Sequence, residues 1–168
     1  GRRRRVNRPR AWALGLAALV LTLDQLTKIA VRDWLLLGER VDVTAFFALV
    51  HAENRGAAFS FLADAAGWQR WFFLALALAF ALWVLRELRG LRADQTALGL
   101  AYGALLGGAL GNALDRGLAG AVTDFLLVHW QGHYFPAFNV ADSALTLAVA
   151  GLLLGWWQDE QRQKKEPS

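Results

Sequence analysis

Four long apolar segments constrain the fold of this chain more than any other feature of its sequence. They lie at 11–31, 68–88, 96–114 and 139–157, and each approaches the roughly 20 residues that a helix needs to cross the hydrocarbon core of a bilayer. Because lipid offers no hydrogen bonds, a spanning segment has to satisfy its own backbone groups, which a helix does and a lone strand does not. We therefore predict an all-α membrane protein with four transmembrane helices, forming one integral membrane domain over residues 1–168.

The composition agrees with a membrane protein and excludes several chemistries. The chain is 56% hydrophobic and has 8 Trp, most of them near the ends of the apolar segments, where interfacial aromatic residues gather. It has no Cys, which excludes disulfides, thiolate nucleophiles and thiolate metal ligands. The net charge of +4 would fit nucleic acid binding in a soluble protein, but the basic residues flank apolar segments, so no nucleic acid partner is expected. Met is absent as well, so Gly1 is interpreted as a processed or engineered start.

The distribution of Lys and Arg predicts the orientation in the membrane. Most of the 18 basic residues lie in three segments, 1–10, 86–95 and 161–168. With four spans these segments share one side, and cytoplasmic loops are the ones that carry an excess of Lys and Arg. The N- and C-termini are therefore predicted to be cytoplasmic, and the connections 32–67 and 115–138 are predicted to face outward.

Polar residues from three predicted helices reach the same depth, near the outer surface. Asp24 lies roughly 21 Å along its helix from Arg10, and Asn112 lies roughly 27 Å along its helix from Asp94. Asp142, in the segment FNVADS, enters its helix from the outer side. Ionisable groups within a membrane helix are costly and are candidates for function by default. Their convergence predicts a polar site at the outer end of the bundle.

Each polar pair also has a purely structural interpretation. Asp24 and Lys28 are one helical turn apart and can neutralise each other. Asp115 and Arg116 can act as interfacial residues that cap the third helix. The third segment also carries glycines at every fourth position, a stripe that lets a neighbouring helix approach closely and indicates packing rather than chemistry. These glycines are Gly99, Gly103, Gly107 and Gly111.

The outer segments contain strand patterns. RVDVTAFF (40–47) alternates in part, and ALVHAENRGAAFSFL (48–62) predicts two short strands around an Asn-Arg-Gly turn. VTDFLLVHWQGHYFPAF (122–138) predicts another strand that ends at Gly and Pro. A small sheet on the outer leaflet is able to cradle an extended peptide, since strand addition is a common way to hold one. The fold class is thus completed by a small extracytoplasmic β-sheet on the outer face, whose apolar side chains suit contact with lipid.

Familiar catalytic patterns other than carboxylates are missing from the sequence. The serines are Ser60, Ser143 and Ser168, and none lies in a nucleophile elbow of the form G-x-S-x-G. His129 and His133, in HWQGH, lack the Glu of the zinc-protease helix motif, so no metal site is expected. Carboxylates remain as the candidate reactive groups.

Two neighbouring carboxylates can catalyse hydrolysis without a metal, a cofactor or a covalent intermediate. Like charges a few ångströms apart cannot both ionise cheaply, so the pair shares one proton. The ionised member then draws a proton from water, while the protonated member hydrogen-bonds the scissile carbonyl. Such a pair titrates as a unit. Spacing alone leaves several pairings open among Asp24, Asp115, Asp124 and Asp142.

Five motifs together resemble those of the bacterial lipoprotein signal peptidases, also called signal peptidase II. They are DQLTK (24–28), NRGAAFS (54–60), GNALDR (111–116), VTDF (122–125) and FNVADS (138–143). The motifs occur in the family's order. The resemblance implies an aspartic endopeptidase of the bacterial plasma (inner) membrane, with its active site facing the outer side. Such an enzyme removes signal peptides from prolipoproteins by cutting before a cysteine that carries diacylglyceryl.

The resemblance also implies roles for particular residues and partners. Asp124 and Asp142 match the family's two catalytic aspartates. Other matched positions line the active site and substrate groove, or have structural or orienting roles. The first group is Asn54, Gly56, Asn112, Arg116, Asn139 and Ala141, and the second is Asp24, Lys28 and Asp115. The implied partners are diacylglyceryl-modified prolipoproteins, membrane lipid and the cyclic-peptide antibiotic globomycin, and no cofactor is implied.

Other classes of membrane protein explain the sequence less well. An ion-coupled membrane transporter also uses intramembrane acids, but it predicts acids at several depths and broken helices near the midplane, whereas here the acids gather on one side. An intramembrane aspartyl protease of the presenilin type expects an aspartate after Gly-x-Gly within a helix, where this chain has Asn112 in GALGN. A non-catalytic scaffold leaves the two matched aspartates without a purpose.

Overall fold

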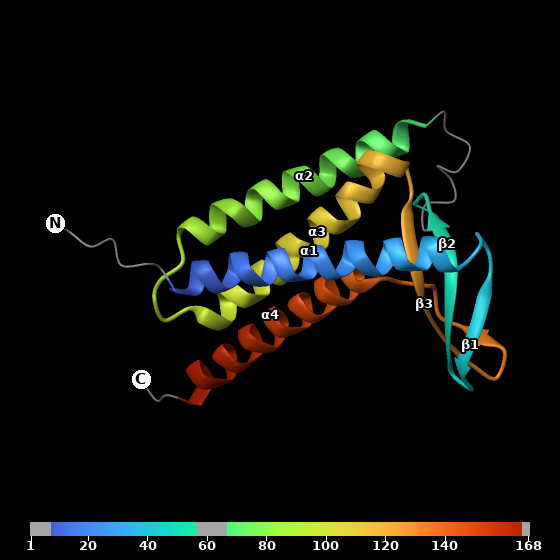
Figure 1. Ribbon diagram of the computed structural model, residues 1–168. Helices are drawn as coiled ribbons and strands as arrows, with labels where there is room; N and C mark the ends of the chain where they lie inside the picture. The colour runs from blue at the N-terminus through green and yellow to red at the C-terminus, as the bar shows by residue number, and fades with distance from the viewer. Residues whose placement is uncertain (1–7, 57–66, 166–168) are drawn as a thin grey trace.

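The computed structural model describes residues 8–56 and 67–165, which form four long helices and a small antiparallel sheet. The helices coincide with the four apolar segments, and all are long and apolar enough to cross a membrane. They lie side by side in an elongated bundle, and the sheet lies at one end of it (Figure 1). The predicted fold class is confirmed. The helices are α1 (Arg8–Trp34), α2 (Trp68–Arg89), α3 (Thr96–Ala119) and α4 (Val140–Lys165).

The helices run past the ends of the apolar segments, because a helix continues into the interfacial region where charged side chains are solvated. α3, predicted to end at residue 114, extends to Ala119. It ends at Gly120, whose φ of 79° requires glycine and whose N–H donates to the Arg116 carbonyl. Asp115 therefore does not cap α3, as one structural interpretation of the sequence proposed; it is buried inside the bundle.

α3 is the centre of the bundle. In its most apolar stretch 56% of the residues are buried, against 28% or less in the other three helices. It packs against all three, while α1 and α2 hardly touch each other. The glycine stripe explains the close approach of α1, since a methyl group on Gly103 or Gly107 would collide with the α1 backbone at Ala13 or Ala17. The packing interpretation of the stripe agrees with this geometry.

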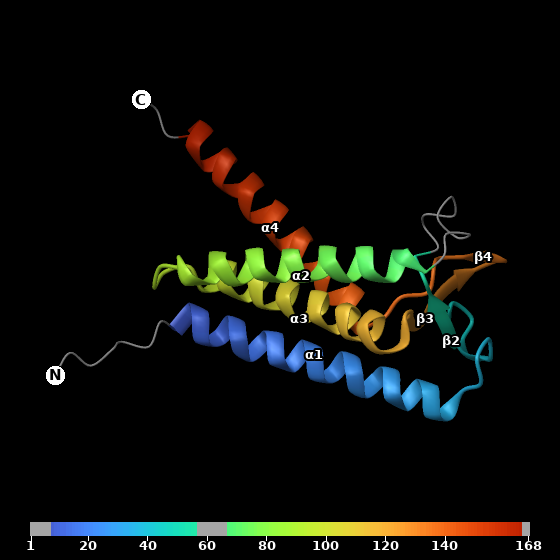
Figure 2. The same cartoon turned by 90° about the horizontal axis from the view of Figure 1, so that it is seen from above.

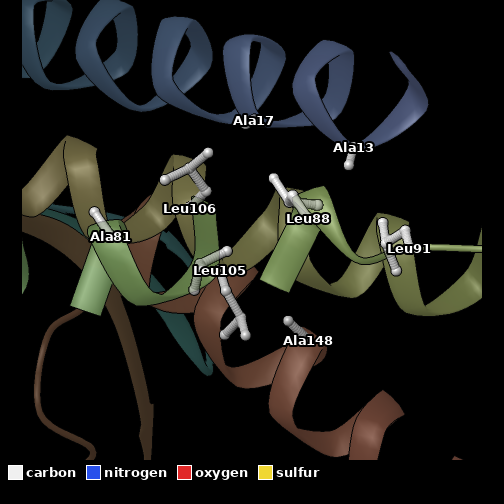
Figure 3. Close-up of a cluster of buried hydrophobic side chains, with 9 residues drawn as sticks. Ala13, Ala17, Ala81, Leu88, Leu91, Leu105, Leu106 and Ala148 are labelled. Carbon is white, nitrogen blue, oxygen red and sulfur yellow. The ribbon is translucent and has the colours of Figure 1, made fainter. Parts of the chain in front are cut away.

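The bundle has one main apolar cluster of buried side chains, which lies between α1 and α4 in Figure 3. α1 contributes small residues to it, so that its backbone lies close to α3, and the larger side chains come from α2 and α3. Towards its C-terminal end α4 leaves the other helices (Figure 2). Ala148 belongs to the cluster, whereas Leu147 and Leu153 are exposed.

Large apolar side chains point outward on all four helices. Examples are Leu26, Leu82, Leu118 and Leu147, each more than half exposed. Soluble proteins rarely carry contiguous apolar surfaces of this kind, whereas hydrocarbon solvates them. The chain is a multi-pass membrane protein.

The sheet has the strand order β1-β2-β3-β4, and each neighbouring pair is antiparallel. The strands are β1 (Arg40–Thr44), β2 (Phe47–Asn54), β3 (Val122–Trp130) and β4 (His133–Tyr134). The strands predicted in 40–47, in the first part of 48–62 and in 122–138 are therefore confirmed, as β1, β2 and β3. The predicted strand after the Asn-Arg-Gly turn falls largely on 57–66, outside the described residues.

The sheet is attached to the end of α1. Phe125 of β3 is buried against Val31 and Leu35, which lie at and just beyond the last turn of that helix. His51 of β2 is buried beside them, and its Nδ1 lies 2.9 Å from the Leu35 carbonyl oxygen. The start of β3 is thus held in place against the bundle, and this placement positions the site.

Candidate active site

Two aspartates meet at the end of the bundle that carries the sheet. Asp124 lies in β3, shortly after α3 ends, and Asp142 lies in the first turn of α4. Asp124 is buried and Asp142 is half-buried. Burial raises the pKa of Asp124, and the negative charge of Asp142 raises it further. The two carboxyl groups are therefore electrostatically coupled.

All four carboxylate oxygens of this pair accept a hydrogen bond. Asn139 Nδ2 donates to Asp124 Oδ1 at 2.7 Å, and Asn54 Nδ2 donates to Asp124 Oδ2 at 3.1 Å. Asn112 Nδ2 donates to Asp142 Oδ1 at 2.7 Å, and the Asn139 backbone N–H donates to Asp142 Oδ2 at 3.3 Å. Every donor is a neutral amide. Among the described residues no Lys or Arg forms an ion pair with either carboxylate.

Asn139 joins the two aspartates because it also caps the start of α4, immediately before Val140. Its Oδ1 accepts the Asp142 N–H at 2.9 Å, and the Asp142 carboxylate accepts the Asn139 N–H in return. This reciprocal arrangement is a capping box with Asp in place of the usual Glu. The spacing Asn-x-x-Asp in FNVADS thus sets the beginning of the helix and the orientation of Asp142 together.

A second pair of aspartates lies directly behind the first, around a buried lysine. Lys28 Nζ lies 2.8 Å from Asp24 Oδ2 and 2.9 Å from Asp115 Oδ2, and it donates to Asn112 Oδ1 at 3.0 Å. Both Asp24 and Lys28 are completely buried. Gln25 Nε2 adds hydrogen bonds to both carboxylates at 3.2 Å. The pairing of Asp24 with Lys28 expected from the sequence is present, but it extends to Asp115 on α3. We call Asp24, Lys28 and Asp115 the buried ion cluster.

The buried ion cluster also holds the backbone on either side of the candidate site. Asp24 Oδ1 accepts the Ala141 N–H at 2.9 Å, and Asp115 Oδ2 accepts the Thr123 N–H at 3.1 Å. Ala141 immediately precedes Asp142, and Thr123 immediately precedes Asp124. Because one lysine binds both carboxylates, the cluster fixes the positions of the two coupled aspartates relative to each other.

Asn112 connects the buried ion cluster with the coupled aspartates. Its Oδ1 accepts from Lys28 Nζ and from Asn139 Nδ2, and its Nδ2 donates to Asp142. The preceding Gly111 makes room for this contact, since a Cβ there would lie 2.5 Å from Asp24 Oδ2. The glycine stripe therefore brings α1 close to α3 at the level where the polar residues meet.

Gly56 and Arg116 complete the set of residues matched by the sequence motifs. Gly56 has a φ of 101°, which favours glycine, and its N–H donates to Asn54 Oδ1 at 2.9 Å. Arg116 is half-buried, and its guanidinium lies over the ring of Phe73 with Cζ 5.5 Å from the ring centroid. Asp124 and Asp142 both act on this guanidinium electrostatically.

Burial raises the pKa of Asp124 from 3.8 to about 6, and the charge of Asp142 adds to the shift. Hydrogen bonds from Asn54 and Asn139 and the charge of Lys28 lower the pKa but do not offset the increase. A carboxyl group with such a pKa exchanges its proton near neutral pH, as a general acid or base requires. Within residues 8–56 and 67–165, no three or more His, Asp or Glu side chains are arranged to hold a metal ion.

The structure brings every residue singled out from the motifs into one region. It also separates the four aspartates into two pairs, which residue spacing did not do. Three contacts were missed in the sequence. Gln25 and Thr123 lie next to motif aspartates in the sequence, and this position could have indicated them. Phe73 lies in an apolar helix, where nothing in the sequence distinguishes it.

Comparison with known proteins gives a consistent result. A family model described as signal peptidase (SPase) II matches residues 16–158. The chain is 46% identical to a lipoprotein signal peptidase of Aeromonas hydrophila over 92% of this chain and 93% of that protein. It is 49% identical to one of Azoarcus sp. (strain BH72) over 92% of this chain and 85% of the relative.

Solved structures agree in fold. One described as a bacterial membrane enzyme, determined by the in meso method at 2.3 Å resolution, superposes with a TM-score of 0.79 at 27% identity. The superposition covers 93% of this chain and 93% of that one. A second, also described as a bacterial membrane enzyme and determined at 1.9 Å resolution, gives a TM-score of 0.75 at 28% identity over 88% of this chain and 93% of that one.

Proposed function

Since the chain belongs to the signal peptidase II family and is therefore a membrane peptidase that removes signal peptides from prolipoproteins, we propose that it cuts with an aspartic dyad, Asp124 and Asp142. The single observation that carries this proposal is the environment of the pair. Two coupled carboxylates receive only neutral amide donors among the described residues, and the pKa of Asp124 is raised to about 6.

The dyad acts by sharing one proton. The ionised carboxylate accepts a proton from a water molecule, and the protonated one donates a hydrogen bond to the scissile carbonyl. Water attacks the carbonyl carbon to give a tetrahedral intermediate. A proton then passes to the leaving amide nitrogen, the C–N bond breaks, and the dyad is left with one proton again. Asn139, bonded to both carboxylates, holds them in register throughout.

The substrate bond is presented at the outer face of a bacterial plasma membrane. Two observations support this orientation. The dyad and the sheet lie at one end of the bundle, and the basic residues Arg86, Arg89 and Arg92 lie at the other, which is the cytoplasmic end by the positive-inside rule. A cysteine carrying diacylglyceryl is anchored in the outer leaflet, so a site at this depth reaches the bond that precedes it. An ion-coupled transporter predicts acids at several depths, so the grouping of the acids at one end does not support it.

The remaining site residues receive supporting roles in this proposal. Asn54 and Gly56 present a donor to Asp124, and Arg116 faces the substrate. Exposed aromatic residues of the sheet and its turns, such as Trp130 in β3 and Phe46 between β1 and β2, are placed to contact lipid beside the substrate. Globomycin, as a cyclic peptide, occupies the same site and competes with the prolipoprotein.

The test is cleavage of a diacylglyceryl-modified prolipoprotein by the purified protein in detergent. Wild type, Asp124→Asn and Asp142→Asn are compared, with folding of each checked by thermal unfolding. Asp33→Asn is the matched control, because this aspartate is exposed at the same end of α1. Both dyad variants are expected to lose cleavage while the control retains it.

Distinct outcomes separate the parts of the proposal. A folded dyad variant that cuts at the wild-type rate removes that aspartate from the mechanism. Cleavage that requires the diacylglyceryl group supports the substrate assignment, and equal cleavage of the unmodified precursor contradicts it. Globomycin that does not raise the apparent KM would contradict a shared site.

A further inference from the structure

Phe73 contacts the candidate site from α2, the helix that none of the five sequence motifs reaches. Its ring is half-buried and packs edge-to-face against Phe72 with centroids 5.3 Å apart. A phenylalanine on an apolar membrane helix has an obvious alternative role in packing or in facing lipid. Two contacts distinguish Phe73 from the other aromatic residues of α2.

The first contact is with the Arg116 guanidinium. Its Cζ lies 5.5 Å from the centroid of the Phe73 ring, within the roughly 6 Å over which a cation is attracted to a ring face. In the part of the chain that the structure describes, Arg116 forms no ion pair, and its hydrogen bond is to the Asn112 carbonyl at 3.5 Å, the limit of such a bond. The ring therefore contributes directly to fixing this guanidinium.

The guanidinium is fixed beside the dyad with donors to spare. Asp142, Asp124 and Asp115 act on Arg116 electrostatically, yet none is bonded to it in the described structure. A guanidinium has five N–H donors in a fixed planar arrangement. Most of these remain for groups that enter the site, and the backbone carbonyls of an extended peptide are acceptors of matching chemistry.

The second contact is with Gly56. A Cβ on this residue would lie 2.8 Å from Phe73 Cε2, so the backbone lies directly against the ring. The Gly56 N–H binds Asn54 Oδ1, and Asn54 Nδ2 binds Asp124. The same ring thus supports Arg116 on one side and, through the turn at 54–56, a donor to the dyad on the other.

We propose that Phe73 is a positioning residue of the peptidase site, whose ring holds the Arg116 guanidinium for hydrogen bonds to substrate carbonyl groups and supports the turn that presents Asn54 to Asp124. The proposal rests on the proposed function, because it assumes that a peptide is cut by the dyad. It adds α2 to the elements that determine catalysis.

The test is a double-mutant cycle on kcat/KM with the diacylglyceryl prolipoprotein. Phe73→Leu keeps an apolar side chain and removes the ring, and Arg116→Gln removes the cation. From the usual strength of a cation–π contact, Phe73→Leu alone is expected to lower kcat/KM by about 2- to 30-fold. In the Arg116→Gln background the same change is expected to have a clearly smaller effect than in wild type, because the cation is already gone and only the support of the turn at 54–56 remains. Phe80→Leu is the control, since Phe80 belongs to the apolar cluster of the bundle.

A second measurement separates a cation–π role from shape. Replacement of Phe73 by fluorinated phenylalanines keeps the size of the ring and weakens the negative charge of its face. We expect kcat/KM to fall in step with the number of fluorines, with thermal unfolding unchanged. Equal losses from Phe73→Leu with and without Arg116, or no response to fluorination, would overturn the positioning role. These outcomes are read with a wild type that cleaves, so they are distinct from failure of the proposed function itself.

Discussion

Two pairs of aspartates lie next to each other at one end of the bundle, and their surroundings differ in one respect. Asp24 and Asp115 bind the same buried lysine at 2.8 and 2.9 Å. Asp124 and Asp142 receive hydrogen bonds from asparagine side chains and one backbone amide, with no bonded cation among the described residues. The first pair shares a direct ion-pair partner, and the second has none and is coupled through mutual repulsion.

One residue type therefore serves two purposes in neighbouring places. A carboxylate bonded to a cation in a dry interior stays ionised and holds backbone in place. A buried carboxyl group bonded only to amides retains a proton more easily and can exchange it. Asn112 is the residue in contact with both pairs, because it accepts from Lys28 and donates to Asp142.

The largest effect is expected when one aspartate of the dyad is replaced and the result is compared with replacement of one aspartate of the buried ion cluster. Asp142→Asn should lower the cleavage rate by about 10³-fold or more, because a missing catalytic group is not replaced, while thermal stability changes little. Asp115→Asn should instead lower stability by about 1–3 kcal/mol, because Lys28 and the Thr123 N–H lose an acceptor. Cleavage rates and unfolding of both variants are measured in the same detergent. An Asp142→Asn protein that unfolds more easily than Asp115→Asn would reverse the proposed division of roles.

Removal of the buried cation is expected to have the next largest effect. Lys28→Met leaves two carboxylates buried without their partner, which should cost about 3–5 kcal/mol of stability. Unfolding of the variant is followed by temperature or by titration with a denaturing detergent. The control combines Lys28→Met with Asp24→Asn and Asp115→Asn, which removes the uncompensated charges and should recover most of the loss. A Lys28→Met protein as stable as wild type would show that the cluster does not hold the bundle together.

Asn112 and Asn54 provide a matched comparison of intermediate size. Asn112→Ala removes an acceptor from Lys28 and a donor from Asp142, so it should lower stability by about 1–3 kcal/mol and slow cleavage as well. Asn54→Ala removes a donor to Asp124 near the surface and should slow cleavage with a smaller change in stability. Rates and unfolding temperatures of the two variants are compared directly. If both change stability equally, Asn112 is not the link between the two pairs.

The raised pKa of Asp124 predicts a pH-dependent difference in stability. This group ionises near 3.8 when the chain is unfolded but near 6 when it is folded, so the folded protein binds the proton more tightly. The stabilisation it gives is complete below pH 3.8 and is lost as the pH rises through 6. In Asp124→Asn this contribution is absent, so its stability relative to wild type should increase from pH 4 to pH 7 by about 2 kcal/mol, allowing for solvent screening. Unfolding temperatures across that range measure it, and a constant difference would contradict the shift.

The smallest effect is expected at Arg32, the second cation near Asp115. Its Nη1 lies 3.9 Å from Asp115 Oδ1 and donates to Thr123 Oγ1 at 3.0 Å, but the side chain is 35% exposed. A solvated ion pair contributes little, so Arg32→Gln should cost less than about 1 kcal/mol. Thermal unfolding beside Lys28→Met gives the comparison. A loss as large as that of Lys28→Met would mean that burial does not distinguish the two cations.

The sequence predicts those features that depend on local properties of the chain, and it does not predict those that depend on how the helices pack together. Hydropathy alone determines the four helices, because each segment must satisfy its own backbone in lipid. The pairing of Asp24 with Asp115 depends on how closely α1 approaches α3, which residue spacing does not contain. The motif match, rather than the spacing, singled out Asp124 and Asp142. Phe73 had no signal, because its contact with Arg116 depends on the position of α2 against α3.

The central position of α3 has a consequence for the order in which the chain is assembled. α1 and α2 are synthesised first but have few contacts with each other, whereas both pack closely on α3. The first two spans therefore have little to hold them together until the third span follows into the membrane. Asp124 and Asp142 come later still in the chain. A nascent protein thus gathers its first three helices before it possesses either of the groups proposed to cut peptides.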